Sequence, residues 1–424
     1  MKRSLIAAAA LALVCTLAPA QSRQYPEPAR LLRENPRRAG CVTDPYEYGP
    51  VEDTPAPKGY KPFYISHYGR HGSRSDWHAE NYSDVVAVLQ KAKEAGILTP
   101  SGDSLMTEAA RVFALHNGMD GRLTDRGVRE HRAIAERMYR RFKPVFTKGP
   151  GRIRAVSSLS QRCIISMTSF SSRLSALQPG LNFTWDTGDK FMPMLSSDGP
   201  GPVNERVYPR LDSLKATYSL DTLGLIQRLF TDPEKARSVV GDQRKFAYQV
   251  FRTAAISASF DLEPSIYRFM PFDLVYDEWD LTNADLYLRQ GNSRDYGALR
   301  MPLAFPLVRD VIAKADEAIA GGAYAADLRF GHDTHLLATA ACMGLEGVGE
   351  QLSLEEARAR WMAFRYAPFA ANLQWVFYRK RSGGDILVKI LHNEREVGII
   401  GLEPVAGPYY RWQDVKARWE AVCR

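Results

Sequence analysis

The chain has 424 residues, of which 45% are apolar and 25% are charged. These proportions are ordinary for a soluble globular protein, and they exclude a fibrous or broadly disordered chain. The formal net charge of +8 favours anionic partners, which include nucleic acid, an anionic surface and a phosphorylated small molecule. The length fits two or three domains, or one large α/β domain with an insertion.

The first 20 residues predict a secretory signal peptide. Lys2 and Arg3 precede an apolar core over residues 5–17, and Ala18-Pro19-Ala20 has the small-x-small pattern of a cleavage site. The core is too short to span a bilayer, which needs about 20 apolar residues. We therefore expect export to a periplasm or beyond, no stable membrane insertion, and a mature charge of +8 − 2 = +6.

Residues 21–58, rich in Pro and Arg, predict an irregular lead-in, and 59–190 then predict the first part of an α/β domain. Strands and helices alternate in this part, which indicates a mostly parallel central sheet with flanking crossover helices. The strands are expected at 60–69, 151–158 and 181–188, and the helices at 81–96, 123–142 (with Thr124 as N-cap) and 161–177.

The pattern changes after residue 191. Helical runs separated by Pro, Gly and Asp, clearest at 241–260, predict an inserted α-helical cap over 191–301. Residues 302–424 return to the α/β pattern as the second part of the same domain. There we expect a helix at 302–320, a strand at 327–330, a turn at 331–335, a helix at 336–343 and a hairpin at 373–391 that turns at Gly383-Gly384.

Four cysteines remain after the expected cleavage. Cys163 and Cys342 lie in apolar helical patterns that are typical of buried thiols. Cys41 and Cys423 lie near the two ends of the chain, and in an exported protein we expect these two to pair. No CxxC spacing indicates a zinc site.

A cationic loop, Arg70-His71-Gly72-Ser73-Arg74, follows the first predicted strand. In open α/β sheets ligands bind at the carboxyl ends of the strands. Arginine presents a fork of donors that matches phosphate oxygens, and nearby cations keep an imidazole neutral and nucleophilic. The spacing alone also fits a solvated basic loop with a surface histidine.

Two further groups follow predicted strands. Gly331-His332-Asp333-Thr334-His335 leads into a helix, whose N-terminus can bind an anion, and Asp333 could act as a general acid. The alternative is that Asp333 is only an acid of the first helical turn. Arg162 adds a third cation at the same sheet edge. The three groups together indicate an anion site with a nucleophile and an acid.

These motifs resemble the acid phosphatase and phytase branch of the histidine phosphatase superfamily. The stretches that carry the resemblance are "RHGSRSD" (70–76), "LTDRG" (123–127), "GHDTH" (331–335) and "APFAANLQWVFYR", within about residues 62–402. The stretch "SSLSQRC" around Arg162 is most similar to the multiple inositol polyphosphate phosphatases. The resemblance implies a phosphoglycerate-mutase-like sheet with a helical cap.

The resemblance also implies the chemistry. His71 would attack phosphorus and form a phosphohistidine, and Asp333 would protonate the leaving alcohol. Arg70, Arg74, Arg162 and His332 would hold the phosphate oxygens. No metal or cofactor is implied, and the expected partner is a phosphorylated small molecule, with phytate (myo-inositol hexakisphosphate) the first expectation, and not nucleic acid.

Two residues depart from the family pattern. Asp76 replaces the Pro that usually closes RHGxRxP. The inositol polyphosphate phosphatases often carry His-Ala-Glu where this chain has His332-Asp333-Thr334. A broad acid phosphatase or a sugar phosphatase therefore stays open as an alternative, as does a protein that binds anions without turnover.

Several polar residues near the motifs are expected to have no part in the reaction. A metal site built on His332, Asp333 and His335 is disfavoured by their spacing and by the nearby arginines. His67 is expected to pack in the interior or to support the catalytic residues, and His335 is expected to be structural, with lining of the pocket as the alternative. Lys190 and Arg206 border the insertion and could contact extra phosphates, but exposure without a function is the stronger expectation for each.

Overall fold

The structure is a computed structural model that describes residues 24–424 except 197–201, 219, 221 and 264. The expected signal peptide lies outside the described residues. No helix of the described chain is long and apolar enough to cross a membrane.

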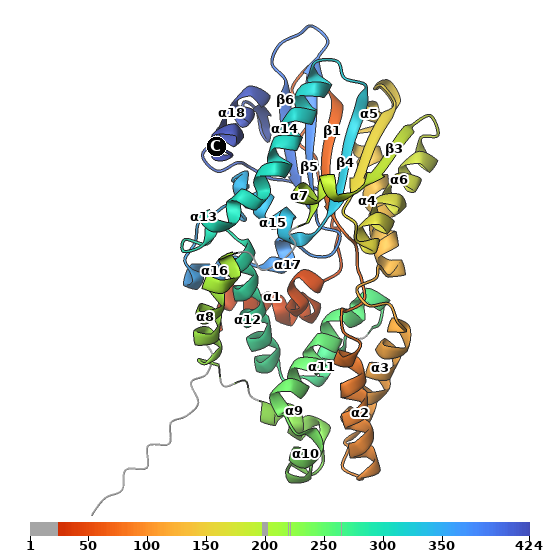
Figure 1. Cartoon of the computed structure of the whole chain (residues 1–424), viewed down its shortest axis with the longest axis vertical. Coiled ribbons are helices and arrows are strands. Elements are labelled where there is room, and N and C mark those ends of the chain that lie inside the picture. Colours follow the sequence, from red (N-terminus) through yellow and green to blue (C-terminus); the bar gives the residue numbers. More distant parts are fainter. Residues whose placement is uncertain (1–23, 197–201, 219, 221, 264) are drawn as a thin grey trace, which may run out of the picture.

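A central sheet of eight strands has the order β3-β2-β4-β1-β5-β6-β7, and β8 pairs with β6 (Figure 1). Its first half, β3-β2-β4-β1, is parallel, and the pairings from β1·β5 onward are antiparallel. The C-terminal half is therefore the predicted hairpin extended by two short strands. The strands are β1 (Tyr60–Arg70), β2 (Arg152–Ser157), β3 (Asn182–Thr187), β4 (Tyr324–Gly331), β5 (Asn372–Lys380), β6 (Leu387–His392), β7 (Arg395–Glu396) and β8 (Tyr409–Arg411).

Helices cover both faces of the sheet, as the sequence predicts. Side chains along a strand point alternately to its two faces. Ile65 of β1 packs in one core with α4, α5 and α6, and the adjacent Tyr64 packs in the other with α14 and α18. The helices are α4 (Asp125–Arg141), α5 (Lys143–Lys148), α6 (Gln161–Leu177), α14 (Phe305–Ile319), α15 (Asp333–Cys342) and α18 (Trp412–Val422). Thr124 caps α4 as expected, because its side chain accepts a hydrogen bond from the Gly127 amide.

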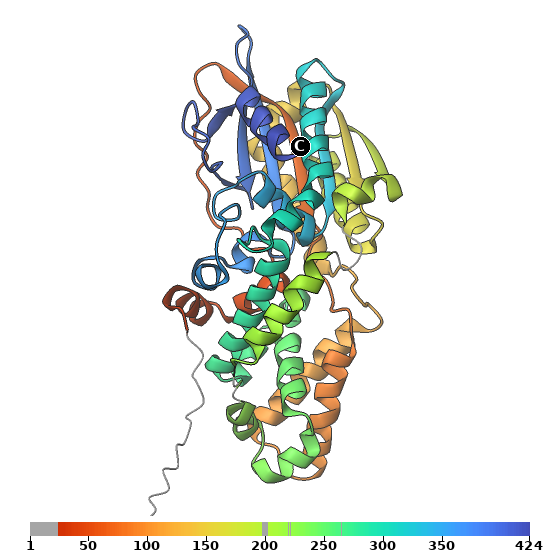
Figure 2. The ribbon, with the colours of Figure 1, turned by 60° about the vertical axis from the view of Figure 1, so that its left-hand side comes forward.

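A second, helical part of the molecule lies beyond the carboxyl ends of the parallel strands (Figures 1 and 2). It includes α2 and α3, which pack against α11 and α9. The helical part therefore draws on residues 80–116 as well as on the range 191–301. Its helices are α2 (Glu80–Glu94), α3 (Pro100–His116), α8 (Pro202–Lys215), α9 (Thr222–Leu229), α10 (Pro233–Val240), α11 (Gln243–Ser257), α12 (Phe272–Gln290) and α13 (Gly297–Arg300).

Short helices fill the junction between the two parts. They are α7 (Met192–Leu195), α16 (Leu354–Arg360), α17 (Ala363–Tyr366) and the 3-10 turns η2 (Asp189–Phe191), η3 (Ala258–Phe260), η4 (Ile266–Phe269) and η5 (Met301–Ala304). The lead-in is not irregular throughout, because it forms α1 (Pro26–Glu34) and η1 (Pro36–Thr43). Pro26 stands at the first position of α1, where its missing N–H is not needed.

The expected Cys41–Cys423 pair is wrong, because all four cysteines after residue 24 are free and buried. Cys41 lies against the backbone of α12, with its Sγ 3.9 Å from the Trp279 carbonyl oxygen. Cys423 neighbours Cys342 instead, and burial together with this neighbour raises the pKa of the Cys342 thiol to about 12.

Candidate active site

The three parallel strands β2, β4 and β1 end side by side and bring the predicted residues together. Arg70 pairs with Gly331 in the β1·β4 register, and Ser157 pairs with Phe330 in the β2·β4 register. The His71 amide extends the first pairing by donating to the Gly331 carbonyl at 3.0 Å. The cationic loop 70–74 therefore lies directly beside His332 and Asp333.

The cationic loop docks on the first turn of α4. A Cβ at Gly72 would lie 2.7 Å from the Gly127 backbone, and one at Gly127 would lie 2.4 Å from the Ser73 carbonyl oxygen. Both glycines are therefore required for this close approach. The buried Glu130 carboxylate accepts the Ser73 amide and hydroxyl, both at 2.7 Å, and Thr124 donates to the Ser73 carbonyl. The "LTDRG" stretch thus fixes the loop that carries His71.

His71 is held as a neutral base with a free nitrogen. Its Nδ1 lies 2.9 Å from the Gly72 carbonyl oxygen, which can only accept, so Nδ1 carries the proton and Nε2 has the free electron pair. Burial, then Arg70 and Arg162, lower the pKa of His71 well below its usual value. Because the imidazole stays uncharged at mildly acid pH, Nε2 can act as a nucleophile there.

Arg70 joins the two motifs. Its guanidinium donates to the backbone carbonyls of Val42 and Ala367, and Nη2 lies 3.7 Å from Oδ2 of Asp333. The group also packs over the Phe369 ring, with 4.7 Å from Cζ to the ring centroid. A guanidinium fixed on three sides can present its remaining donor edge to a phosphate without reorganising.

Arg74 and Arg162 stack on one aromatic ring, that of Trp77. Their Cζ atoms lie 4.8 and 4.5 Å from the ring centroid of Trp77, whose side chain is half exposed. Burial, followed by the charges of Arg162 and Arg70, lowers the pKa of Arg74 to about 9. Burial lowers the pKa of Arg70 and Arg162 as well, and three buried cations are best balanced by a polyvalent anion.

His332 and Asp333 face the arginines from the start of α15. His332 Nδ1 lies 3.4 Å from Nη2 of Arg162, and its Nε2 lies 3.1 Å from the Ser158 hydroxyl. Burial, then Arg162, lower the pKa of His332 to about 3. Burial would raise the pKa of Asp333, but Arg70 and His332 outweigh it, so the pKa lies below its usual value. Asp333 is the first residue of α15 and not part of the expected turn.

Asp76, the residue that replaces the family's Pro, is buried and joins the cationic loop to the helical part. Arg252 of α11 holds its carboxylate, with Nη2 at 2.9 Å from both oxygens. The Trp77 amide and the Asn81 side chain also donate to the carboxylate, and the Asp76 amide donates to the Tyr82 hydroxyl. Because its charge is matched by Arg252, Asp76 does not oppose an anion beside Arg74.

The remaining predicted residues lie where the sequence places them. His67 is buried between Phe170 and Phe330, and burial together with His131 lowers its pKa to about 3. His335 is buried, with its Nε2 3.3 Å from the Pro193 carbonyl oxygen. Lys190 is exposed and pairs with Asp186 at 2.7 Å, and Arg206 is exposed.

Four residues of the site were not predicted. Trp77, Glu130 and Ser166 contact the cationic loop, Ser166 by accepting the Gly72 amide at 3.1 Å, and Arg252 contacts Asp76 just after the loop. Trp77 follows the motif directly and could have been found as an aromatic beside two arginines. The other three lie at least 57 residues away from their partners, and no local pattern marks them.

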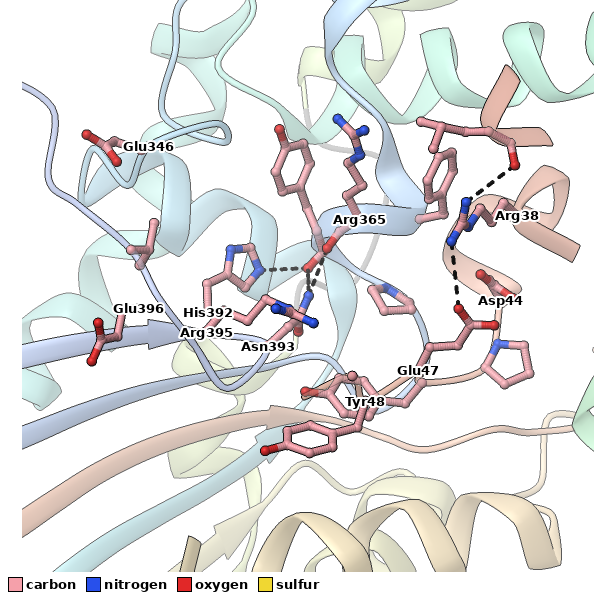
Figure 3. Close-up of a pocket in the computed structure, with 18 residues that line it drawn as sticks. Arg38, Asp44, Glu47, Tyr48, Glu346, Arg365, His392, Asn393, Arg395 and Glu396 are labelled. Carbon is pink, nitrogen blue, oxygen red and sulfur yellow. Dashed lines mark hydrogen bonds and ion pairs between the residues drawn. The ribbon is translucent and has the colours of Figure 1, made fainter. Parts of the chain in front are cut away.

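A cavity of about 600 Å³ opens elsewhere, between the lead-in and the turn after β6 (Figure 3). Its lining mixes the charges of Arg38, Glu47 and Arg395 and includes none of the six predicted site residues. It adjoins the segment that carries Phe369, because the backbone carbonyl of Asp44 on its wall accepts the Phe369 amide at 2.9 Å. Burial, then Glu47, raise the pKa of Asp44 to about 8.

Comparisons with known proteins concern the family and the fold. A family model described as histidine phosphatase superfamily (branch 2) matches residues 69–393. No curated protein matches the sequence. Among solved structures, the apo form of the multiple inositol polyphosphate phosphatase of Bifidobacterium longum has a TM-score of 0.69 at 19% identity, covering 89% of this chain and 97% of that chain.

Two phytase structures are also similar. The phytase from D. castellii has a TM-score of 0.72 at 14% identity and covers 95% of this chain and 89% of that chain. The Hafnia alvei phytase in complex with myo-inositol hexakis sulphate has a TM-score of 0.53 at 12% identity and covers 87% of this chain and 100% of that chain. At these identities the likeness shows the shared fold.

Proposed function

The chain belongs to branch 2 of the histidine phosphatase superfamily and is a phosphatase, and we propose that it hydrolyses inositol polyphosphates, with phytate as the first substrate. One observation carries the proposal: a neutral, buried His71 lies among three guanidiniums at the end of parallel strands, and Asp333 lies beside one of them, Arg70. The mature charge expected from the sequence suits a polyanion. The likeness to phytases and to an inositol polyphosphate phosphatase supports the substrate class.

In the proposed reaction, Nε2 of His71 attacks phosphorus while the bond from phosphorus to the leaving oxygen breaks. Asp333 gives its proton to that oxygen, and the alcohol departs. Water then attacks the phosphohistidine, the Asp333 carboxylate takes the water's proton, and phosphate leaves with His71 restored. Arg70, Arg74, Arg162 and His332 bind the three phosphoryl oxygens throughout.

The negative charge of the bound substrate favours the protonated form of Asp333, which a general acid requires. In the empty site Arg70 and Arg74 contribute to the low pKa of Asp333. A phosphate dianion offsets these two charges, so the carboxyl holds a proton more readily when the substrate is bound. This coupling favours activity at acid pH.

Two other functions fit parts of the site. A broad acid phosphatase or sugar phosphatase needs the same phosphate-binding residues. It differs only in the residues around them that contact the rest of the substrate. An anion-binding protein without turnover needs neither a nucleophile nor an acid, so the paired His71 and Asp333 speak against it. We also propose that the protein is exported, on the strength of the expected signal peptide.

A time course of phytate hydrolysis with the inositol phosphate isomers resolved tests the substrate. We expect stepwise loss of phosphate and a kcat/KM for phytate above that for p-nitrophenyl phosphate. A higher value for the nitrophenyl ester and for simple sugar phosphates would favour the broad acid phosphatase. The N-terminal residue of the purified extracytoplasmic protein tests export and cleavage after Ala20.

A further inference from the structure

Four arginines of the described chain share an uncommon feature. The Nε atom of each is buried and has no hydrogen-bond partner. Buried polar groups are normally satisfied, so each exception needs an explanation. Three of the four are Arg70, Arg74 and Arg162, which the site assigns to phosphate. The fourth is Arg300.

Arg300 is a buried cation without an ion-pair partner among the described residues. Its residue is 8% exposed, and no described carboxylate forms an ion pair with any of its nitrogens. The neighbouring arginines of the same region are paired, Arg289 with Asp285 and Arg294 with Glu356. A cation taken out of water without an anion is costly, and proteins pair or neutralise such groups. Arg300 therefore has the character of the phosphate-binding arginines.

The position of Arg300 connects it with the reacting groups. It is the last residue of α13 and leads directly into η5, and η5 packs against α15, which begins at Asp333 (Figure 1). Burial, then Arg289, lower the pKa of Arg300 to about 10, while the charge of Asp333 raises it. The guanidinium is thus within electrostatic reach of the proposed general acid. Among its nitrogens, only Nε is both buried and without a hydrogen-bond partner, and 8% of the residue stays exposed.

We propose that Arg300 binds a second anionic group of the same substrate molecule while another of its phosphates is held by Arg70, Arg74 and Arg162. This inference rests on the proposed function, because it gives a polyphosphorylated substrate its second point of attachment. The charge of Asp333 acts on both Arg70 and Arg300, so the proposal places the leaving oxygen between the two bound phosphates. A substrate with adjacent phosphates on a ring matches this requirement, whereas a simple monoester cannot use Arg300.

Inhibition of p-nitrophenyl phosphate hydrolysis tests the subsite without requiring that phytate be the substrate. Two inhibitors are compared in wild type and Arg300→Gln: myo-inositol hexasulfate, which has several anionic groups, and inorganic phosphate, which has one. The matched control is Arg294→Gln, which removes an exposed, paired arginine from the same segment. Circular dichroism spectra of both variants exclude a folding defect, and Arg300→Lys tests whether a cation alone partly restores binding.

We expect the inhibition constant of hexasulfate to rise about tenfold in Arg300→Gln, as for the loss of a charge-assisted hydrogen bond. The constant of inorganic phosphate should rise far less, and Arg294→Gln should change neither. Equal increases for both inhibitors would overturn the proposal, because Arg300 would then act through Asp333 or the single phosphate site. No change for hexasulfate would overturn it as well. Failure to hydrolyse phytate would refute the proposed substrate. The comparison of hexasulfate with inorganic phosphate as inhibitors would still test the subsite.

Discussion

The carboxylate of Asp76 forms an ion pair with Arg252, whose Nη2 lies 2.9 Å from both carboxylate oxygens. Asp76 belongs to the loop that carries His71, and Arg252 belongs to α11 of the helical part. The pair therefore ties the two parts of the molecule together beside Arg74. It also explains why an acid is tolerated where the family has Pro, because Arg252 matches its charge.

Breaking the pair should weaken the fold. Asp76→Ala leaves the largely buried Arg252 unpaired, and we expect the free energy of unfolding to fall by about 3 kcal/mol. Urea denaturation measures the loss, and Arg252→Met in the same background should recover part of it. If the losses of unfolding free energy in the two single variants simply added in the double variant, a direct interaction between Asp76 and Arg252 would be contradicted.

The same pair predicts a pH dependence of stability. Burial would raise the pKa of Asp76, but Arg252 and the Trp77 amide lower it below its usual value. A carboxyl with a depressed pKa in the folded state stabilises the protein above its unfolded pKa, and this stabilisation disappears as the pH falls through the folded value. The stability difference between wild type and Asp76→Ala should therefore be constant near neutral pH and shrink below about pH 4.

The ring of Trp77 should orient two phosphate-binding arginines. Trp77→Ala removes two cation–π contacts, and we expect the KM for p-nitrophenyl phosphate to rise about fivefold, with a smaller change in kcat. Trp77→Phe keeps an aromatic face and should recover most of the affinity. Steady-state kinetics measures both constants. If Phe were no better than Ala at this position, the ring would have no part in binding.

The effect on kcat of removing the general acid should depend on the leaving group. Asp333→Asn should lower kcat by about 100-fold or more for an alkyl phosphate, whose alkoxide needs a proton, and far less for nitrophenyl phosphate. For wild type with the alkyl ester, kcat should decline as the pH rises, because less Asp333 is protonated. The variant should lose that slope. Equal losses on the two substrates would count against Asp333 as the general acid.

The titration of His71 should lie well below the ordinary range. Its burial and the charges of Arg70 and Arg162 disfavour the imidazolium, so His71 should stay neutral as the pH falls from 7 to 5. NMR titration of histidine-labelled protein, with the signal assigned by its loss in His71→Ala, measures this directly. A His71 signal that moves with a midpoint near pH 6.5 would show that the arginines do not control its charge.

The sequence could predict the site because its residues follow buried strands. The apolar run of β1 leads directly to Arg70 and His71, and that of β4 leads to His332 and Asp333. Parallel strands that end together bring these short motifs into contact. Thr124 was predictable for a similar reason, since an N-cap and the helix it starts are adjacent in the chain.

Other features depend on contacts between distant segments. Asp76 and Arg252 are 176 residues apart, and nothing near either one indicates the other. The pattern of α2 shows that one of its faces is buried, but not that α11 covers it. Arg300 resembles many surface arginines in sequence, and what distinguishes it is burial without a partner in the described part of the chain.

Trapping the covalent intermediate tests the central claim most directly. The protein is mixed with ³²P-labelled substrate, quenched within milliseconds and digested, and the labelled peptide is sequenced by mass spectrometry. We predict an acid-labile, alkali-stable phosphoramidate on His71, formed at least as fast as turnover and absent from His71→Ala. Label on another residue, or full turnover by His71→Ala, would contradict the account.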